Sequence, residues 1–315
     1  MNWRFFSKFA TQHQLAIPIQ YNTIKYKMQK ISFIVAGHRF TIEMAEEEIE
    51  TLLPSLEPFR TETTGDDLFS ITVDNNIQPT WRGERVGHFP CPSAKFEVYR
   101  MDNGAYQILV LDESNIPCAF LQSDEAYRHF TIATRGNRGC RTFGLNNALM
   151  VIYTLCTAPH KTLLMHSSVV ENGNKAYMFL GVSGQGKSTH SDLWVNHIEG
   201  STLINDDNPV LRIADDGTPY IYGSPWSGKR PIYRNVHYPI AGMAAIEQKK
   251  ENSIRKEPIP MAFGILLSSC STLKFDKVVH MNICRTITGV LEKVAVHTLQ
   301  CRPDKEAAEL SHSTL

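Results

Sequence analysis

The chain has 315 residues, 42% of them hydrophobic and 20% charged, and its 32 basic residues balance 32 acidic ones to a formal net charge of zero. This composition is typical of a globular protein with a sizeable core, and it argues against a disordered chain or a generally basic, nucleic-acid-binding surface. The sequence shows no apolar run of the length of a signal peptide or a membrane span, so we expect a cytoplasmic protein with no nucleic-acid partner and no membrane partner.

The cysteines predict neither a metal site nor a disulfide framework. There are seven, an odd number, and no two are spaced as a C-x-x-C pair. Zinc sites and disulfide-stabilised domains show paired spacings, so free thiols are expected here.

The first part of the chain predicts a short arm followed by a mostly β domain. Residues 1–28 show weak periodicity, which indicates a flexible arm or an upstream extension before a start at Met28. Alternating apolar residues then predict a hairpin over 30–42, and helical spacing predicts a short helix over 45–53. We assign 29–138 to a mostly β N-terminal domain, whose later strands are expected at 68–73, 95–99, 106–111, 119–121 and 129–132.

The period of the apolar residues changes after the glycines of 135–140. Residues 144–158 have helical spacing and end at Pro159, so we place a domain boundary before them and assign 139–315 to a second domain. Residues 162–170 then read as one strand, 171–174 as a turn and 175–180 as an apolar strand. The remaining elements are expected to be strands at 202–204, 210–213, 220–222, 240–246 and 294–299, and helices at 188–198, 258–267, 280–291 and 305–310.

A glycine-rich segment follows the strand at 175–180. Its sequence, Gly-Val-Ser-Gly-Gln-Gly-Lys-Ser, fits the phosphate-binding pattern G-x-x-x-x-G-K-[ST] in full, and a strand precedes it and a helix follows it, as that pattern requires. Glycines let backbone N–H groups converge on an anion, Lys187 adds a charge for the outer phosphates, and Ser188 offers a hydroxyl to magnesium. We therefore expect ATP and Mg2+ to bind here, with nucleotide contacts from Gly181, Val182, Ser183, Gly184, Gln185, Gly186, Lys187, Ser188 and Thr189.

Two further features are expected to lie beside this segment. The turn at 171–174 returns the chain so that His166 comes near the phosphate-binding end of the neighbouring strand. Asp206 and Asp207 follow an apolar strand, at the carboxyl end where open α/β sheets bind ligands. An Asp pair more often makes a turn, but here one carboxylate is placed to hold magnesium while its neighbour accepts a hydroxyl proton.

The order of these elements resembles the HPr kinase/phosphorylase family, whose fold is similar to that of phosphoenolpyruvate carboxykinase. The segment Leu-Met-His-Ser-Ser-Val-Val at 164–170 resembles the histidine strand of HPr-kinase-like proteins, and 223–229 resembles a turn of their shorter relatives. The likeness covers roughly 144–304. It implies an α/β fold, with a phosphate-loop core and mixed sheet preceded by a smaller, mostly β domain.

The same resemblance implies roles for single residues. Lys187 would hold the phosphates, and Ser188 and Asp206 would hold the metal. Asp207, in preference to Asp206, would be the base that takes the hydroxyl proton, and His166 would orient its carboxylate. Arg230, or Arg234 in its place, is the candidate for the family's catalytic arginine. The family's later metal-binding glutamate has no clear counterpart, and the β domain does not match the regulatory domain of true HPr kinases, so a different acceptor is expected.

The sequence thus predicts an ATP- and Mg2+-dependent kinase that transfers phosphate to a hydroxyl, on a serine of a protein or peptide or on a small metabolite. The alternative is a catalytically weak, nucleotide-binding regulatory protein that uses its β domain as an interaction surface. Carboxykinase chemistry needs metal ligands that the sequence does not display, and the serine-hydrolase pattern G-x-S-x-G is not met. The acceptor, the donor (ATP, ADP or pyrophosphate) and assembly into a homo-oligomer stay open.

Overall fold

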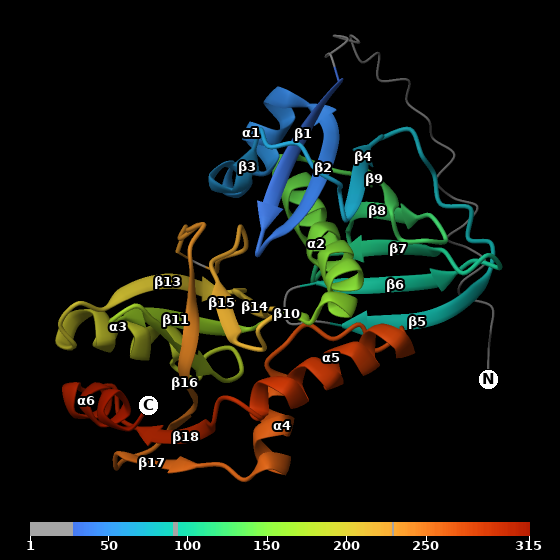
Figure 1. Cartoon of the computed structure of the whole chain (residues 1–315). Coiled ribbons are helices and arrows are strands. Elements are labelled where there is room, and N and C mark those ends of the chain that lie inside the picture. The colour runs from blue at the N-terminus through green and yellow to red at the C-terminus, as the bar shows by residue number, and fades with distance from the viewer. Residues whose placement is uncertain (1–27, 91–93, 229) are drawn as a thin grey trace.

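The computed structural model describes residues 28–90, 94–228 and 230–315. The predicted arm lies outside these residues except for Met28. The described chain has an α/β fold with two large mixed sheets, each of nine strands (Figure 1). Within the described ranges, no helix is both long enough and apolar enough to cross a membrane.

The first sheet is built from the N-terminal half of the described chain, in the order β3-β1-β2-β4-β9-β8-β7-β6-β5. Most neighbours are antiparallel, whereas β4 is parallel to both β2 and β9. Helix α1 (Glu46–Leu52) and the 3-10 helix η1 (Pro54–Phe59) follow the first hairpin. The strands are β1 (Met28–Val35), β2 (His38–Ala45), β3 (Arg60–Thr61), β4 (Phe69–Val73), β5 (Glu84–Pro90), β6 (Lys95–Arg100), β7 (Tyr106–Leu111), β8 (Pro117–Ser123) and β9 (His129–Thr134).

The hairpin of β1 and β2 confirms the predicted alternation. Phe33 and Val35 on β1, and Phe40 and Ile42 on β2, are each at most 1% exposed and occupy alternate positions. Side chains at alternate positions of a strand share one face, so this face is buried in the core. Gly37 in the connecting turn has φ +76°, a left-handed conformation that glycine adopts without a steric penalty.

Helix α2 (Arg138–Thr157) packs against β8 and β9 of the first sheet, although the sequence pattern assigns it to the second domain (Figure 1). Gly144 allows this close approach, because a Cβ at this position would lie 2.5 Å from the backbone carbonyl carbon of Cys118. The helix also contacts β10 of the second sheet, so it joins the two sheets.

The expectation that all cysteines are free is wrong for one pair. Cys118 on β8 forms a disulfide with Cys140 in the first turn of α2, and their Cα atoms are 5.1 Å apart. The two positions are 22 residues apart in sequence and meet only through the packing of α2 on β8, which no local spacing reveals. The free cysteines of the described residues are Cys156, Cys270, Cys284 and Cys301, and Cys91 lies outside those residues.

The second sheet has the order β10-β14-β15-β16-β12-β11-β13, and β18 and β17 extend it beside β16. Strand β12 lies in its interior, parallel to β16 and antiparallel to β11. The members are β10 (Thr162–Leu164), β11 (Ser167–Asn172), β12 (Lys175–Leu180), β13 (Thr202–Asp207), β14 (Val210–Ile213), β15 (Pro219–Tyr222), β16 (His237–Gln248), β17 (Ser253–Lys256) and β18 (Val296–Cys301).

The single strand predicted at 162–170 is divided in two. Strand β10 pairs with β14, whereas β11 pairs with β12 and β13, and Met165 and His166 lie between them. The division occurs because the backbone of His166 leaves the sheet to donate a hydrogen bond to the carbonyl of Ser269, at 2.6 Å. His166 is therefore between two strands and not, as predicted, within one.

Two pairs of helices accompany the second sheet. Helices α3 (Lys187–His197) and α6 (Lys305–Thr314) pack together on one face, where the fully buried Trp194 donates a hydrogen bond from Nε1 to Ser311 at 2.8 Å. Helices α4 (Ile259–Ser268) and α5 (Lys277–Leu291) pack together, and Figure 1 shows α5 as the one that lies near the first sheet. The apolar spacing of α4 and α5 suggests that Met261 and Met281 are core residues, but they are 56% and 44% exposed.

One continuous cluster of buried apolar side chains runs from the first sheet through α2 into the second sheet. Polar contacts cross the same junction. Tyr153 of α2 donates a hydrogen bond to the carbonyl of Val35 at 3.0 Å, and Tyr106 of β7 donates one to Asp276, which caps α5, also at 3.0 Å. The position of the second sheet is thus fixed by packing as well as by chain connectivity.

His38 lies in this junction, and its burial is expected to make the stability of the fold sensitive to acid. It is 6% exposed and its Nε2 is 2.8 Å from the Thr162 hydroxyl. Burial, with smaller contributions from Arg212 and His160, lowers the pKa of His38 to about 3. Between pH 3 and 6.5 the unfolded chain binds a proton that the folded chain does not, so stability is present above pH 6.5 and is lost as the pH falls.

We expect the free energy of unfolding to fall by up to about 1.4 kcal/mol per pH unit below 6.5 from this histidine. Urea unfolding between pH 7 and 4 measures the slope, which His38→Gln should reduce and His197→Gln, at the exposed end of α3, should not. An unchanged slope in His38→Gln would show that the ring does not stay neutral on folding.

Candidate functional site

The glycine-rich loop, residues 181–188, connects the interior strand β12 to helix α3, as predicted. Gly181, Gly184 and Gly186 have φ values of +142°, +85° and +99°. Such angles are strained for residues with a Cβ, and at Gly181 a Cβ would also lie 2.5 Å from Oε1 of Gln185. The backbone path of the loop therefore requires glycine at these places.

Lys187, the first residue of α3, is folded back into the loop. Its Nζ donates hydrogen bonds to the carbonyls of Gly181 at 2.8 Å and Val182 at 3.3 Å, and the side chain is almost entirely buried. Burial lowers the pKa of Lys187, and the negative charges of Asp207 and Asp206 oppose that shift. Both carboxylates of the pair are thus close enough to act on the lysine electrostatically.

A chain of contacts joins this lysine to Asp207. Lys187 Nζ is 3.1 Å from Nε2 of His166, and Nδ1 of His166 is 3.0 Å from Oδ1 of Asp207. An ammonium group can only donate, so Nε2 accepts, and the proton of a neutral ring then lies on Nδ1, the ring nitrogen that is close to the carboxylate. Asn208 donates to the other oxygen of Asp207 at 2.9 Å, which fixes the orientation of that carboxylate.

Asp206 faces a different partner. Its Oδ2 accepts a hydrogen bond from Nε of Arg230 at 2.7 Å, and the same guanidinium also pairs with Asp192 of α3. The Asp206 side chain is only 6% exposed. Arg230 therefore neutralises a nearly buried carboxylate and ties the end of β13 to the helix that follows the glycine-rich loop.

The segment carrying Arg230 is held against the end of β13 by close backbone contacts. Gly228 N–H donates to the carbonyl of Asp206 at 3.1 Å, and a Cβ on Gly228 would lie 2.9 Å from that same oxygen. The buried Trp226 accepts a hydrogen bond from Asn205 through its carbonyl, at 3.1 Å. Arg234, the other candidate arginine, is exposed and forms no ion pair within the described part of the chain.

The donor set fits magnesium better than zinc. Within the described ranges, no group of three or more His, Cys, Asp or Glu side chains is arranged to hold a metal. Magnesium keeps several waters and usually takes one or two protein oxygens together with phosphate oxygens of its ligand. The exposed hydroxyl of Ser188 and the carboxylate of Asp206 fit such a set, once Arg230 releases that carboxylate.

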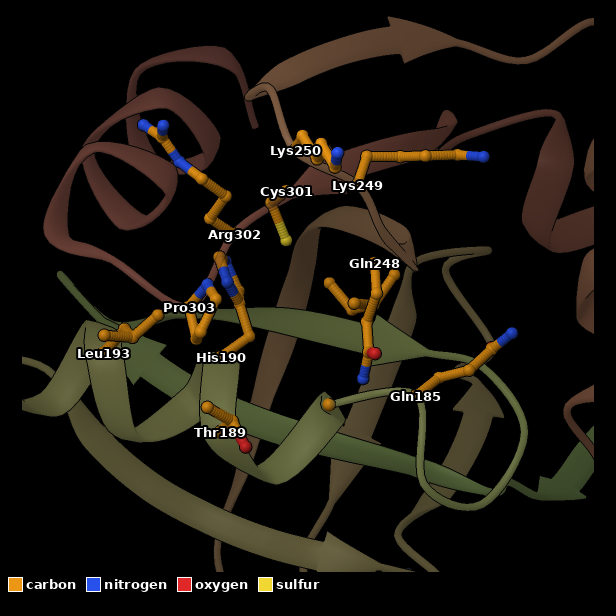
Figure 2. Close-up of a pocket in the computed structure, with 12 residues that line it drawn as sticks. Gln185, Thr189, His190, Leu193, Gln248, Lys249, Lys250, Cys301, Arg302 and Pro303 are labelled. Atoms are coloured by element: carbon orange, nitrogen blue, oxygen red, sulfur yellow. The ribbon is translucent and has the colours of Figure 1, made fainter.

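A cavity of about 550 Å³ lies on the other side of the loop (Figure 2). Gln185 and Gly186 of the loop line it together with residues of α3, of the end of β16 and of the segment between β18 and α6. Sequence reasoning missed this cavity because its walls come from three distant segments. It also missed Asp192, which no motif marks.

The structure therefore brings most of the predicted site residues together. Lys187, His166 and Asp207 form one connected group, and Asp206 and Arg230 form an adjacent pair. Comparison of the chain with models of known protein families gave no match, and comparison with curated proteins gave none either. The resemblance to HPr kinases thus depends on the residues of this chain alone.

Proposed function

We propose that the protein is an ATP- and Mg2+-dependent kinase that transfers phosphate to a hydroxyl, with a core like that of HPr kinase/phosphorylase. The observation that carries the proposal is the connected group of Lys187, His166 and Asp207, with contacts of 3.1 and 3.0 Å. It joins the cation of a phosphate-binding motif to an oriented carboxylate. Phosphoryl transfer needs these two parts, a cradle for the phosphates and a group that receives the acceptor's proton.

In this mechanism the chain positions the reactants. The loop amides and Lys187 bind the phosphates, and His166 lies between Lys187 and Asp207, with its Nδ1 3.0 Å from the Asp207 carboxylate. Asp207 takes the proton of the acceptor hydroxyl as that oxygen bonds to the terminal phosphorus and the bond from phosphorus to the leaving diphosphate breaks. Bound magnesium would neutralise charge on the phosphates, and Ser188 and Asp206 are the residues that would hold it.

The ion pair between Asp206 and Arg230 favours the alternative function, a catalytically weak, nucleotide-binding regulatory protein. In the described structure the carboxylate is occupied by a guanidinium, with the Nε to Oδ2 distance at 2.7 Å. A protein that keeps this pair when a nucleotide binds would hold the nucleotide without assembling a metal site. It would then act as a nucleotide-binding regulator, with the first sheet as its interaction surface.

Label transfer from ATP decides between the two functions. The purified protein is incubated with Mg2+, γ-labelled ATP and a cell extract, and the labelled products are separated by size and identified. A kinase should label one protein, peptide or metabolite in a manner that depends on Mg2+. A protein that binds ATP but transfers no label under these conditions would be assigned to the regulatory class.

A further inference from the structure

Asn205, the residue before the two aspartates, has a fully buried side chain that forms hydrogen bonds at both ends of its amide. Its Oδ1 accepts from the backbone N–H of Asp207 at 3.1 Å, and its Nδ2 donates to the carbonyl of Trp226, also at 3.1 Å. A backbone N–H can only donate and a carbonyl oxygen can only accept, so the two partners determine how the amide is oriented. An ionised aspartate at this place would direct a carboxylate oxygen at the Trp226 carbonyl, so the site requires an amide.

The path of β13 brings this amide to its partners. The register of β13 on β11 shifts between Val169 and Val170. The shift skips Ile204, the residue before Asn205, and a bulge of this kind bends a strand and redirects the side chains beside it. The contact from Asn205 to the N–H two residues further on is an Asx turn, a local arrangement that fixes the backbone. The end of β13 is therefore shaped by this side chain as well as by strand pairing.

A second buried side chain, that of Ser224, holds the residue on the other side of Asp207. Its hydroxyl donates to the carbonyl of Asn208 at 2.5 Å and accepts from the backbone N–H of Trp226 at 3.1 Å. Asn208 in turn donates to Oδ2 of Asp207 at 2.9 Å. The segment 224–226 thus contacts both of the asparagines that hold Asp207.

Trp226 attaches this segment to the core. It is 5% exposed, and its ring packs edge-on against Tyr153 of α2, with the ring centroids 5.1 Å apart. Edge-on aromatic pairs add stability beyond the area that they bury. Tyr153 is itself hydrogen-bonded to Val35 of the first sheet. The carbonyl that Asn205 contacts is therefore held by the core of the protein and not by a surface loop.

From these contacts we infer that Asn205 is a positioning residue, which sets the place of Asp207 relative to His166 by joining the Asp207 backbone to the segment 224–226. Its side chain is fully buried, so it acts through Asp207, whose Oδ1 is 3.0 Å from Nδ1 of His166. Placement matters because a shift of about 1 Å at a reacting group costs about 100-fold in rate. The inference rests on the proposed function, in which Asp207 takes the acceptor's proton.

Asn205→Ala removes both contacts of the amide, and single-turnover transfer from γ-labelled ATP to the cell extract measures the result. We expect the rate to fall about 100-fold and ATP affinity to stay within about threefold, because Asn205 lies outside the glycine-rich loop. In the Asp207→Asn background the same substitution should change the rate less than about twofold, since no base is left to position. A loss of equal size in both backgrounds would indicate a general structural role and overturn the inference.

Two further variants separate positioning from loss of a buried amide. Asn205→Ser keeps a weaker acceptor for the N–H two residues further on, so it should recover part of the rate that Asn205→Ala loses. Gln107→Ala is the matched control, because Gln107 on β7 is a 1% exposed amide that donates to Thr80 and Gln122. It should leave transfer unchanged. No recovery in Asn205→Ser, or an equal loss in Gln107→Ala, would contradict the role of Asn205.

A measurement without turnover separates this inference from the proposed function. In NMR of protein with isotope-labelled histidine, the Nδ1 resonance of His166, assigned with His166→Gln, reports the carboxylate beside it. Asn205→Ala should move this resonance toward its position in Asp207→Asn, and Gln107→Ala should not. An unmoved resonance in Asn205→Ala would overturn the inference. A protein that transfers no label but shows the shift would lose the proposed function and keep Asn205 as the residue that positions Asp207.

Discussion

Asp207→Asn should lower the rate of phosphate transfer by about 10²- to 10⁴-fold, the range expected when a general base is lost. The amide has nearly the same shape as the carboxylate but does not take a proton at neutral pH. ATP affinity should stay within about threefold of the wild type, because Asp207 contacts His166 and Asn208 and lies outside the glycine-rich loop. Single-turnover transfer and equilibrium binding of ATP measure the two quantities.

Asp215→Asn is the control for this substitution. Asp215 is an exposed aspartate in the turn between β14 and β15, so transfer should be unaffected. Transfer at the wild-type rate in Asp207→Asn would assign the base to another residue. Asp206→Asn would then be the variant to test, because Asp206 precedes Asp207 on the same strand and its charge also acts on Lys187.

Lys187→Met should weaken the binding of both ADP and pyrophosphate by about 30- to 4,000-fold. The lysine is the cation inside the loop, and removal of one charge from a desolvated contact costs roughly 2–5 kcal/mol, which corresponds to these ratios. Titration calorimetry with each ligand measures the effect. Because the loop cation serves any polyphosphate, the two ligands should be affected alike.

The same substitution should leave the fold largely intact. Burial lowers the pKa of Lys187, which means that the folded state disfavours its charged form, and an apolar side chain of similar length removes that cost. We expect the free energy of unfolding to change by less than about 1 kcal/mol. A large loss of stability would mean that Lys187 is a structural cation and that its effect on ligand binding is indirect.

Local order in the sequence predicted much of this structure. The alternation of Phe33 and Val35 with the half-buried Ser32 and Ile34 predicted β1, and the glycines of 181–186 predicted a turn, where their φ values are positive. These features depend on residues that are close in sequence, so the local sequence pattern is sufficient to predict them. Asp206 and Asp207 were expected just after a strand at 202–204, and the structure includes them as the last two residues of β13.

Features that depend on tertiary packing were not predictable in this way. The run of apolar residues at 162–170 looks like one strand, and only the hydrogen bond from His166 to Ser269 divides it. The disulfide between Cys118 and Cys140 forms because α2 packs on β8. Nothing in its neighbourhood marks Asp192 as the partner of Arg230, because the two residues come from separate elements.

Polar groups of the glycine-rich loop already form hydrogen bonds within the loop. Val182 N–H donates to Oε1 of Gln185 at 3.0 Å, and Lys187 donates to two loop carbonyls, so an incoming anion must exchange these contacts rather than add to them. This exchange favours highly charged ligands, because a monovalent anion forms weaker contacts with the loop than the internal hydrogen bonds that it would replace. Chloride and acetate in a buffer should therefore compete poorly for the loop, and a polyanion should be needed to open it.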